Sequence, residues 1–208
     1  MDKNTTILLA TRNNGKIKEF ARLLAPFGLQ VAGLADFPDL VEVEETGKTF
    51  EENALLKAAY ASKNTGLIAV SDDSGLMVAA LNGAPGIYSA RFSEQNGYPA
   101  TDEGNNKKLL ELLNGKPKNE REAKFVSVVA AVAPNGTHIT ATGEWAGFIT
   151  TEAKGENGFG YDPLFFDPET SQTAAQMPPH EKNARSHRAK ATAKLLELWP
   201  DFWEKVKD

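Results

Sequence analysis

The sequence contains no cysteine, and this absence narrows the chemistry that is open to the protein. Without cysteine the chain has no disulfide bond, no thiolate ligand for zinc and no thiol nucleophile. Histidine is also scarce, with three in 208 residues, and no two are spaced as in a zinc site. A metal ion, if the protein uses one, would therefore be held by carboxylates, which favours Mg²⁺ or Mn²⁺.

Long hydrophobic runs are missing as well. No stretch of about eighteen apolar residues occurs, so we expect no membrane-spanning helix and no membrane partner. The N-terminal sequence MDKNTTILLATRNNGK lacks the long apolar region and the small-residue cleavage site of a secretory signal. We therefore expect a cytoplasmic protein.

Positive charge is not in excess, because 23 lysines and arginines stand against 28 acidic residues, a formal net charge of −5. A nucleic-acid partner is not expected, since binding one needs a basic face. A small anionic ligand is compatible, because a few cations that converge on one site can hold it. With 41% hydrophobic residues the chain can bury one substantial core, so we expect a single domain over residues 1–208, as one body or two closely joined lobes.

Strands and helices alternate in the first half of the chain. Apolar residues 7–10 are typical of a short buried strand, and helical spacing of apolar residues follows up to Phe27. A strong turn signal, Pro134-Asn135-Gly136-Thr137, predicts a hairpin later. We therefore expect an α/β fold with a mixed β-sheet flanked by helices. The predicted strands are 7–10, 29–34, 67–70, 125–133 and 138–145; the predicted helices are 17–27, 54–63 after a capping box at Thr49, 105–113, and a closing helix through Trp199 with Trp203 in a short tail.

The first predicted strand is followed at once by a polar loop that contains a glycine. Such a loop, when a helix follows it, exposes backbone N–H groups at the positive end of the helix dipole and can hold a phosphate. The loop is not a Walker loop, because GxxxxGK[ST] is absent. An ordinary asparagine–glycine turn is the alternative interpretation. The loop residues are Thr11, Arg12, Asn13, Asn14, Gly15 and Lys16.

The stretch IAVSDDSGL places two adjacent carboxylates, Asp72 and Asp73, after an apolar run. Side chains on a strand alternate between its two sides, so these two should point in different directions. We expect the strand to end here, at the carboxyl edge where open α/β sheets bind ligands. Together with Glu44 or Glu45 from the preceding acidic loop, one aspartate could bind Mg²⁺, which takes one or two carboxylates. A simple turn and a solvated acidic loop are the alternatives.

A glycine-rich segment, GENGFGYDP, carries aromatic residues that could meet a flat ligand. Glycine lets a backbone approach a ring closely, and either Phe159 or Tyr161 could stack on a base. Asp162 could accept a hydrogen bond from a ring N–H. The alternative is a surface loop whose aromatic side chains fold into the core.

A basic cluster, Lys182, His187 and Arg188, follows near the C-terminal end. Either Ser186 caps a helix that begins at His187, or a helix already runs from about Pro179. On one continuous helix Lys182 and Arg188 would face different directions, so a shared ligand requires a break. A solvated basic helix face is the alternative.

These signals occur in one order along the chain: TRNNGK, EETGKTFEENALLKA, DDSGL, GAPGIYSARF, GFGYDP and EKNARSHR. The series closely resembles the inosine triphosphate pyrophosphatase family, from about Ile7 to Leu198. Members of that family hydrolyse the non-standard purine nucleotides ITP, dITP and XTP to the nucleoside monophosphate and pyrophosphate, with Mg²⁺. The resemblance implies an elongated α/β protein of two lobes with an active-site cleft between them, and usually a homodimer.

The resemblance also implies roles for individual residues. Asp73 would be the general base and, with Glu44, a metal ligand; Glu44 is chosen over Glu45 by its three-residue offset from Gly47. Arg12 stands where the family commonly has glycine. The residues implied in substrate binding are Thr11, Arg12, Asn13, Asn14, Gly15, Lys16, Lys57, Ser74, Phe159, Gly160, Tyr161, Asp162, Lys182, His187 and Arg188.

Cleavage to a monophosphate requires attack of water on the α-phosphorus. The cations Lys16 and Lys57 would offset charge on the leaving pyrophosphate. Arg188 would donate a hydrogen bond to the 6-oxo group of hypoxanthine, and Asp162 would accept one from its N1–H. Adenine has a donor at position 6 and an acceptor at N1, so it would satisfy neither residue. Whether Asp73 removes a proton or positions the water, and whether Asp72 is a ligand or an anchor, stays open. The competing hypotheses are a nucleotide sensor without catalysis and a phosphatase that attacks the terminal phosphorus.

Overall fold

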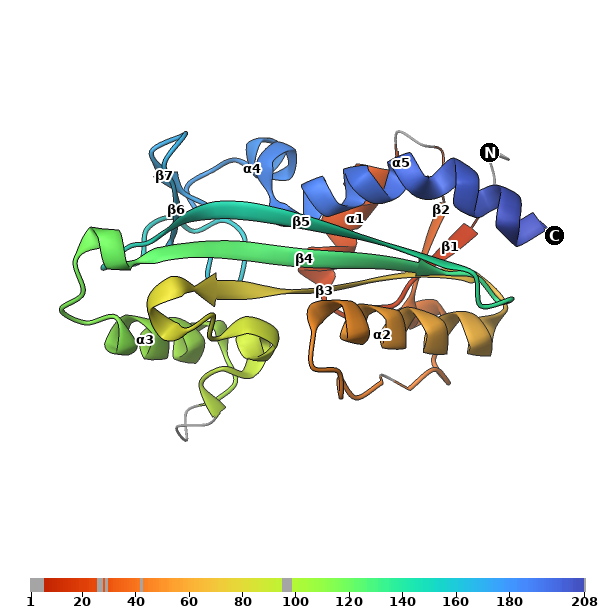
Figure 1. Ribbon diagram of the computed structural model, residues 1–208, viewed down its shortest axis with the longest axis horizontal. Helices are drawn as coiled ribbons and strands as arrows, with labels where there is room; N and C mark the ends of the chain where they lie inside the picture. Colours follow the sequence, from red (N-terminus) through yellow and green to blue (C-terminus); the bar gives the residue numbers. More distant parts are fainter. Residues whose placement is uncertain (1–5, 26–27, 29, 42, 95–98, 208) are drawn as a thin grey trace. The chain divides into compact units, whose positions relative to one another are not determined.

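The structure is a computed structural model that describes residues 6–25, 28, 30–41, 43–94 and 99–207, without the side chains of residues 14, 19, 23 and 207. Its centre is a seven-stranded mixed sheet flanked by helices, which confirms the expected α/β class (Figure 1). In spatial order the strands are β2 (Gln30–Gly33), β1 (Thr6–Leu9), β3 (Ile68–Val78), β4 (Glu122–Val132), β5 (His138–Ile149), β6 (Phe165–Asp167) and β7 (Gln172–Thr173). The α-helices are α1 (Asn14–Leu24), α2 (Phe50–Thr65), α3 (Asp102–Leu112), α4 (Pro179–Arg185) and α5 (His187–Lys207), and short 3₁₀ helices are η2 (Leu34–Asp36), η3 (Ala79–Leu81), η4 (Gly86–Arg91) and η6 (Lys118–Glu120).

The sheet is parallel at one end and antiparallel at the other. Strand β1 runs parallel to both β2 and β3, with Leu9 opposite Val70, whereas β6 is antiparallel to β5 and to β7. The predicted hairpin is confirmed, since β4 and β5 are neighbours joined by the turn at residues 133–137. Strand β1 ends at Leu9 while β3 continues, so Asp72 and Asp73 lie just beyond the carboxyl end of β1.

Strand β3 is longer than the sequence suggested. The predicted strand at residues 67–70 is confirmed, but the expectation that it ends at the aspartates was wrong, because β3 runs to Val78. The reason is burial: Leu76 and Val78 are fully buried in a second hydrophobic cluster and hold the strand extended. The aspartates therefore lie within a strand and not in a turn.

Helix termini follow the capping signals in the sequence. The hydroxyl of Thr49 accepts a hydrogen bond from the backbone N–H of Glu52, and Gly66 ends α2 in the left-handed conformation, at φ 70°. At the start of α1, the side chain of Asn13 accepts a hydrogen bond from the N–H of Lys16. These caps fix where α1 and α2 begin, and with them the positions of Lys16 and Lys57.

The basic segment near the C-terminal end forms two helices with a break between them. Ser186 is extended, at φ −61° and ψ 152°, so one helix runs from Pro179 and a second begins at His187. The two starts, predicted as alternatives, are therefore both present, with the break between the two helices at Ser186. Helix α5 continues past Pro200 to Lys207, so the prediction of a short tail at Trp203 was wrong. Within the described residues, none of the helices combines the length and the apolar character that a membrane span requires.

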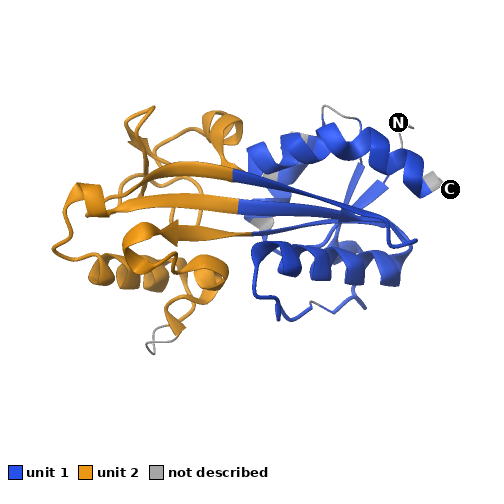
Figure 2. Cartoon of the chain, in the orientation of Figure 1, with its two compact units in different colours: residues 1–73, 127–143, 188–208 blue, residues 74–126, 144–187 orange. Residues whose placement is uncertain are grey.

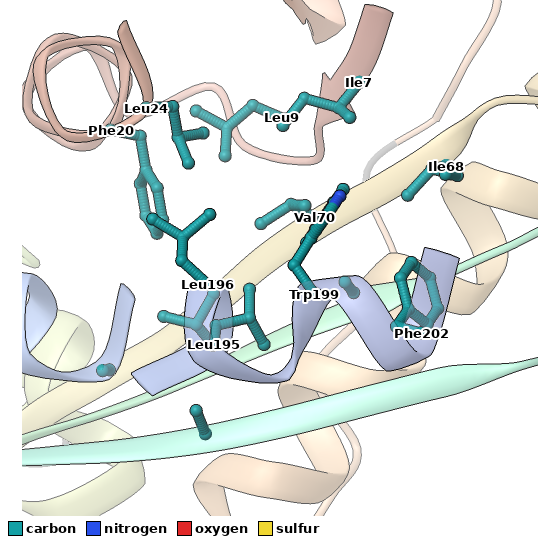
Figure 3. Packing of buried hydrophobic residues seen from close by; sticks show 14 of the residues in the cluster. Ile7, Leu9, Phe20, Leu24, Ile68, Val70, Leu195, Leu196, Trp199 and Phe202 are labelled. Atoms are coloured by element: carbon teal, nitrogen blue, oxygen red, sulfur yellow. The ribbon is translucent and has the colours of Figure 1, made fainter. Parts of the chain in front are cut away.

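The chain divides into two compact units, coloured separately in Figure 2. Unit 1 comprises residues 1–73, 127–143 and 188–208, and unit 2 comprises residues 74–126 and 144–187. The main core of unit 1 brings α1 and α5 against the sheet, with Phe20, Leu195 and Trp199 among its buried side chains (Figure 3). The main core of unit 2 includes Trp145 and Phe165. That the two form one domain stays a prediction.

Alternation along the strands of unit 1 separates its two faces. Ile68 and Val70 of β3 pack in the cluster that contains α1 and α5, whereas Ala69 packs in the cluster that contains Ala61 of α2. Helix α2 covers one face of the sheet, and α1 with α5 covers the other (Figure 1). By this alternation Asp72 belongs to the face of α1 and α5, and Asp73 to the face of α2.

Candidate active site

Asp72 is buried and surrounded by positive charge. Its Oδ2 lies 3.1 Å from Nε of Arg188 at the start of α5, and its Oδ1 lies 2.9 Å from Nζ of Lys16 in α1. Burial alone would raise the pKa of Asp72, but the charges of Arg188, Lys16 and Lys57 outweigh burial and hold that pKa well below its usual value. Asp72 therefore ties β3 to α1 and α5, which supports the anchor interpretation.

Asp73 points the other way, as predicted, and meets α2. Its Oδ1 lies 3.1 Å from Nζ of Lys57, and its Oδ2 accepts a hydrogen bond of 3.1 Å from Nδ2 of Asn53. Burial, followed by the nearby charge of Glu45, raises the pKa of Asp73, although Lys57 acts in the opposite direction. Asp73 is therefore a stronger base than an exposed aspartate.

Lys57 joins Asp73 to the acidic loop. Its ammonium lies 2.6 Å from Oε1 of Glu45, 3.1 Å from Asp73 and 3.0 Å from the backbone oxygen of Asp72. Glu44, which the sequence analysis selected, is exposed, whereas Glu45 is partly buried. The geometry therefore favours Glu45 as the partner of Asp73.

Glu44 was preferred to Glu45 as the acid near Asp73, and Asn53 was not predicted as a site residue. A signal for Asn53 was present, because Asn53 and Lys57 are four residues apart on a predicted helix and so share one face. Both side chains contact Asp73. The choice between Glu44 and Glu45 depends on the path of the loop, for which the sequence has no comparable signal.

The donors around this point suit a hard cation. Two carboxylates, Asp73 and Glu45, already share one positive group, the ammonium of Lys57. Mg²⁺ typically takes one or two carboxylates and keeps water or phosphate oxygens for its other positions. Across the described residues no group of three or more histidines and acids is arranged to hold a metal, so the other ligands would be water or substrate. The residues fit Mg²⁺.

The loop before α1 is held by local hydrogen bonds. Thr11 accepts a bond of 3.1 Å from the N–H of Asn13, and Arg12 donates one of 3.1 Å to the carbonyl of Leu40. Gly15 lies in the first turn of α1, and the side chain of Asn14 lies outside the described part of the chain. The loop thus leads directly into a capped helix N-terminus that carries Lys16.

In unit 2 the glycine-rich segment and α4 form a second polar group. The carboxylate of Asp162 accepts hydrogen bonds from the N–H of Phe159, at 2.9 Å, and from Nζ of Lys182, at 2.6 Å. The same ammonium lies 5.0 Å from the centre of the Phe159 ring, a cation–π distance. Phe159 is only partly buried, so an aromatic face lies next to a paired lysine and carboxylate.

Glycine is required at the turn that builds this group. Gly158 has φ 81°, and a Cβ there would overlap the carboxylate of Asp162. The neighbouring Gly160 donates its N–H to Asp102 at 2.6 Å and accepts a bond of 2.9 Å from Asn106. The segment is therefore fixed to α3 by its backbone.

The predicted base-binding residues Tyr161 and His187 are buried, like Asp162 and Lys182. Tyr161 donates its hydroxyl to the carbonyl of Ser89 at 2.8 Å, and burial, helped by Asp102, raises the pKa of this tyrosine. His187 stacks on Phe125 with ring centres 4.8 Å apart. Of the two aromatic candidates for stacking, Phe159 is therefore the accessible one.

The predicted substrate-binding residues are distributed over both units. Phe159, Asp162 and Lys182 are joined in unit 2, whereas Arg188 belongs to unit 1 and pairs with Asp72. Ser74 is partly buried on β3, directly after Asp73.

Known proteins resemble the chain over nearly its whole length. The Ham1 family model matches residues 7–198. A dITP/XTP pyrophosphatase of Nitratidesulfovibrio vulgaris is 54% identical over 201 residues, which cover 95% of this chain and 97% of that protein. One from Streptococcus agalactiae is 55% identical over 198 residues, and there the chain spans only 60% of the relative's length.

A solved structure of a HAM1 protein from Coxiella burnetii superimposes with a TM-score of 0.84 at 41% identity, covering 95% of this chain and 99% of that one. The shared fold and the relatives' names confirm the resemblance to nucleoside triphosphate pyrophosphatases that the sequence motifs suggested. The chain belongs to the Ham1 family.

Proposed function

We propose that the protein hydrolyses non-standard purine nucleoside triphosphates, namely ITP, dITP and XTP, to the nucleoside monophosphate and pyrophosphate. The relatives whose names specify dITP/XTP pyrophosphatase support this substrate class. The observation that carries the chemistry is the arrangement of Asp73 and Glu45 around Lys57 at the carboxyl end of β1.

Asp73 with Glu45, in preference to Glu44, would hold Mg²⁺, and the bound ion would supply positive charge that polarises the phosphate oxygens. Asp73 orients the attacking water toward the α-phosphorus, and its raised pKa favours acceptance of the proton. A bound cation acts against that basicity, so orientation of the water is the role that survives metal binding.

Two lysines of unit 1, Lys57 and Lys16, stabilise the negative charge on the leaving pyrophosphate. The ammonium of Lys57 lies between the carboxylates of Glu45 and Asp73. It can therefore contact a phosphate oxygen in place of one of these carboxylates. Lys16 lies in the first turn of α1, where backbone N–H groups also favour anions. Together they offset the negative charge that develops on pyrophosphate.

The group in unit 2 is suited to the purine. Phe159 provides a face for stacking, and Asp162 can accept from N1–H. Lys182, in place of the predicted Arg188, can donate to a 6-oxo group, because Arg188 pairs with Asp72. Adenine carries a 6-amino donor next to an unprotonated N1, so it would leave these groups unpaired. A site built on such bonds rejects the wrong ligand by roughly 10⁴-fold or more.

A product assay tests the proposal directly. The protein is incubated with Mg²⁺ and ITP, dITP, XTP, ATP or GTP, and the products are identified. IMP and pyrophosphate from ITP are expected. IDP and phosphate would indicate a phosphatase, and tight binding without turnover would indicate a nucleotide sensor; either result would overturn the proposal.

Matched variants separate the two candidate acids of the loop. We expect Glu45→Gln to raise the Mg²⁺ concentration needed for half-maximal turnover by about 10-fold or more, as for loss of a ligand, and Glu44→Gln to leave it nearly unchanged. The reverse order would return the role to Glu44.

We also infer a homodimer that acts on the nucleotide pool of the cytoplasm, as the family resemblance implies. Sedimentation equilibrium across a range of protein concentrations measures the mass in solution. A single species with the mass of one chain would contradict the dimer.

A further inference from the structure

Asn53 uses both ends of its buried side-chain amide. Its Oδ1 accepts a hydrogen bond of 2.8 Å from the backbone N–H of Gly47, and its Nδ2 donates one of 3.1 Å to Oδ2 of Asp73. The side chain is shielded from solvent, since the residue is 1% exposed. Because one partner is a donor and the other is an acceptor, only one orientation of the amide satisfies both.

On the loop side, this contact fixes the segment that carries Glu45. Gly47 is two residues after Glu45, and a Cβ at Gly47 would lie 2.5 Å from Oδ1 of Asn53 and 2.9 Å from its backbone nitrogen, so a side chain here would displace the loop from Asn53. The next N–H, that of Lys48, donates to the carboxylate of Glu52 at 2.6 Å. Two consecutive backbone N–H groups of the loop are thus held by the first turn of α2.

On the strand side, Asn53 contacts only one of the two carboxylate oxygens of Asp73. Its amide takes Oδ2, while Oδ1 faces Lys57, which in turn contacts Glu45. We propose that Asn53 is a positioning residue that sets the spacing between Glu45 and Asp73 and selects Oδ1 of Asp73 as the oxygen that faces the metal. This inference rests on the proposed function, because it concerns the metal used in that reaction.

A buried asparagine that only holds the fold together is the competing explanation, and the chain contains a matched example. Asn105 on α3 is 3% exposed, accepts a hydrogen bond of 2.8 Å from the N–H of Ser93, and donates one of 3.1 Å to the carbonyl of Ala90. Its partners in these bonds are backbone groups, whereas Asn53 contacts a carboxylate. Asn105→Ala is therefore a control for the loss of two buried hydrogen bonds.

The test measures Mn²⁺ binding to the nucleotide-free protein by electron paramagnetic resonance, with thermal unfolding in parallel. We expect Asn53→Ala to weaken Mn²⁺ binding by about 10- to 100-fold, as the loss of a residue that orients a metal ligand does. Asn105→Ala should leave binding within about twofold, because it has no partner in common with Asp73. Both variants should lower Tm. Wild-type Mn²⁺ affinity in Asn53→Ala, with Tm reduced as in Asn105→Ala, would overturn the inference.

A second pair of variants approaches the contact from the loop and serves if Asn53→Ala does not fold. Gly47→Ala pushes a methyl group against Oδ1 of Asn53 and should weaken Mn²⁺ binding in the same direction. Gly33→Ala in β2 is its control, since the nearest atom to a Cβ there is 4.0 Å away. Equal Mn²⁺ affinity in these two variants would also overturn the inference.

Turnover separates a failure of this inference from a failure of the proposed function. At saturating Mg²⁺, Asn53→Ala should keep its KM for ITP and lose kcat, because the substrate contacts remain while the metal geometry is disturbed. A wild-type protein that neither binds Mn²⁺ nor hydrolyses ITP would overturn both. A fully active wild type with an equally active Asn53→Ala variant would overturn only the role of Asn53.

Discussion

The adjacent aspartates Asp72 and Asp73 on β3 have opposite surroundings, which shift their pKa values in opposite directions. Asp72 is ionised at a site where Arg188 and Lys16 stabilise the negative charge. The pKa of Asp73 is raised, because burial and the charge of Glu45 oppose its ionised form more than Lys57 favours it. We therefore expect the first carboxylate to stabilise the fold and the second to take part in the proposed hydrolysis.

Replacing Asp73 should abolish turnover without harming the fold. Asp73→Asn removes both the proposed metal ligand and the proposed base, so we expect kcat for ITP to fall by about 10²- to 10⁴-fold. Because the ionised form of Asp73 is disfavoured by burial, the free energy of unfolding should stay within about 1 kcal/mol of wild type or rise. Urea unfolding and product assays measure the two quantities, with exposed Asp39→Asn as control. Wild-type turnover in Asp73→Asn would show that Asp73 is neither the metal ligand nor the base.

Replacing Asp72 should have the opposite profile. Asp72→Asn leaves the buried guanidinium of Arg188 without this carboxylate, and removal of one partner of a buried pair costs about 3–5 kcal/mol. Urea unfolding at neutral pH measures the loss. A variant as stable as Asp73→Asn would show that Asp72 is not an anchor.

The pH dependence provides the second measurement on Asp72. Its pKa is lowered in the folded protein, so its contribution is fully present above the ordinary value of 3.8 and is lost as pH falls below it. Wild-type stability should therefore drop as the medium becomes more acidic than that value, and Asp72→Asn should show a shallower drop. Parallel curves for the two proteins would contradict this assignment.

At the scale of elements, the turn before Asp162 depends on a glycine for two reasons. A side chain at Gly158 would have to adopt φ 81° and would also overlap Asp162, whereas Gly136 in the hairpin has φ 86° with open space around it. Gly136→Ala should cost about 1–2 kcal/mol from the left-handed backbone alone. Gly158→Ala should cost more and should also raise KM for ITP. Equal losses of stability and equal KM values would show that the contact with Asp162 is unimportant.

Elements were predictable where the signal is local. Periodicity located α1, and the capping box located α2, because Thr49 acts on an N–H group three residues away. Two errors have non-local causes. Strand β3 continues through the aspartates because Leu76 and Val78 are buried in a cluster with residues far along the chain, such as Phe165. Helix α5 continues through Pro200 because the neighbouring Trp199 is buried in the core of unit 1.

The candidate site was predictable as a set of residue types but not as a set of contacts. The motifs located Asp73, Lys57 and Asp162, each of which has the partners a polar site needs. They could not show that the hydroxyl of Tyr161 donates a hydrogen bond to the carbonyl of Ser89, 72 residues earlier, or that Arg188 forms an ion pair with Asp72. Such pairings depend on which strands become neighbours, and no local pattern encodes that.

At the scale of the whole molecule, strands β3, β4 and β5 each contribute residues to both units. Loss of either unit would therefore break strands that the other needs, and we expect one cooperative unfolding transition. The tryptophans allow a test, because Trp145 belongs to unit 2 while Trp199 and Trp203 belong to unit 1.

Trp145→Phe leaves fluorescence from unit 1, and the double variant Trp199→Phe/Trp203→Phe leaves it from unit 2. In each protein the fluorescence midpoint in urea should coincide with the midpoint from far-ultraviolet circular dichroism. A fluorescence transition that precedes the loss of helix in either protein would mean that the units unfold separately.

The position of the Lys57 ammonium between two acids has a consequence for how the protein folds in the cell. A newly synthesised chain carries its own counterion for this acidic pair, so folding does not have to wait for a divalent ion. On the proposed function, chains synthesised without Mg²⁺ would fold and would stay inactive until Mg²⁺ is supplied.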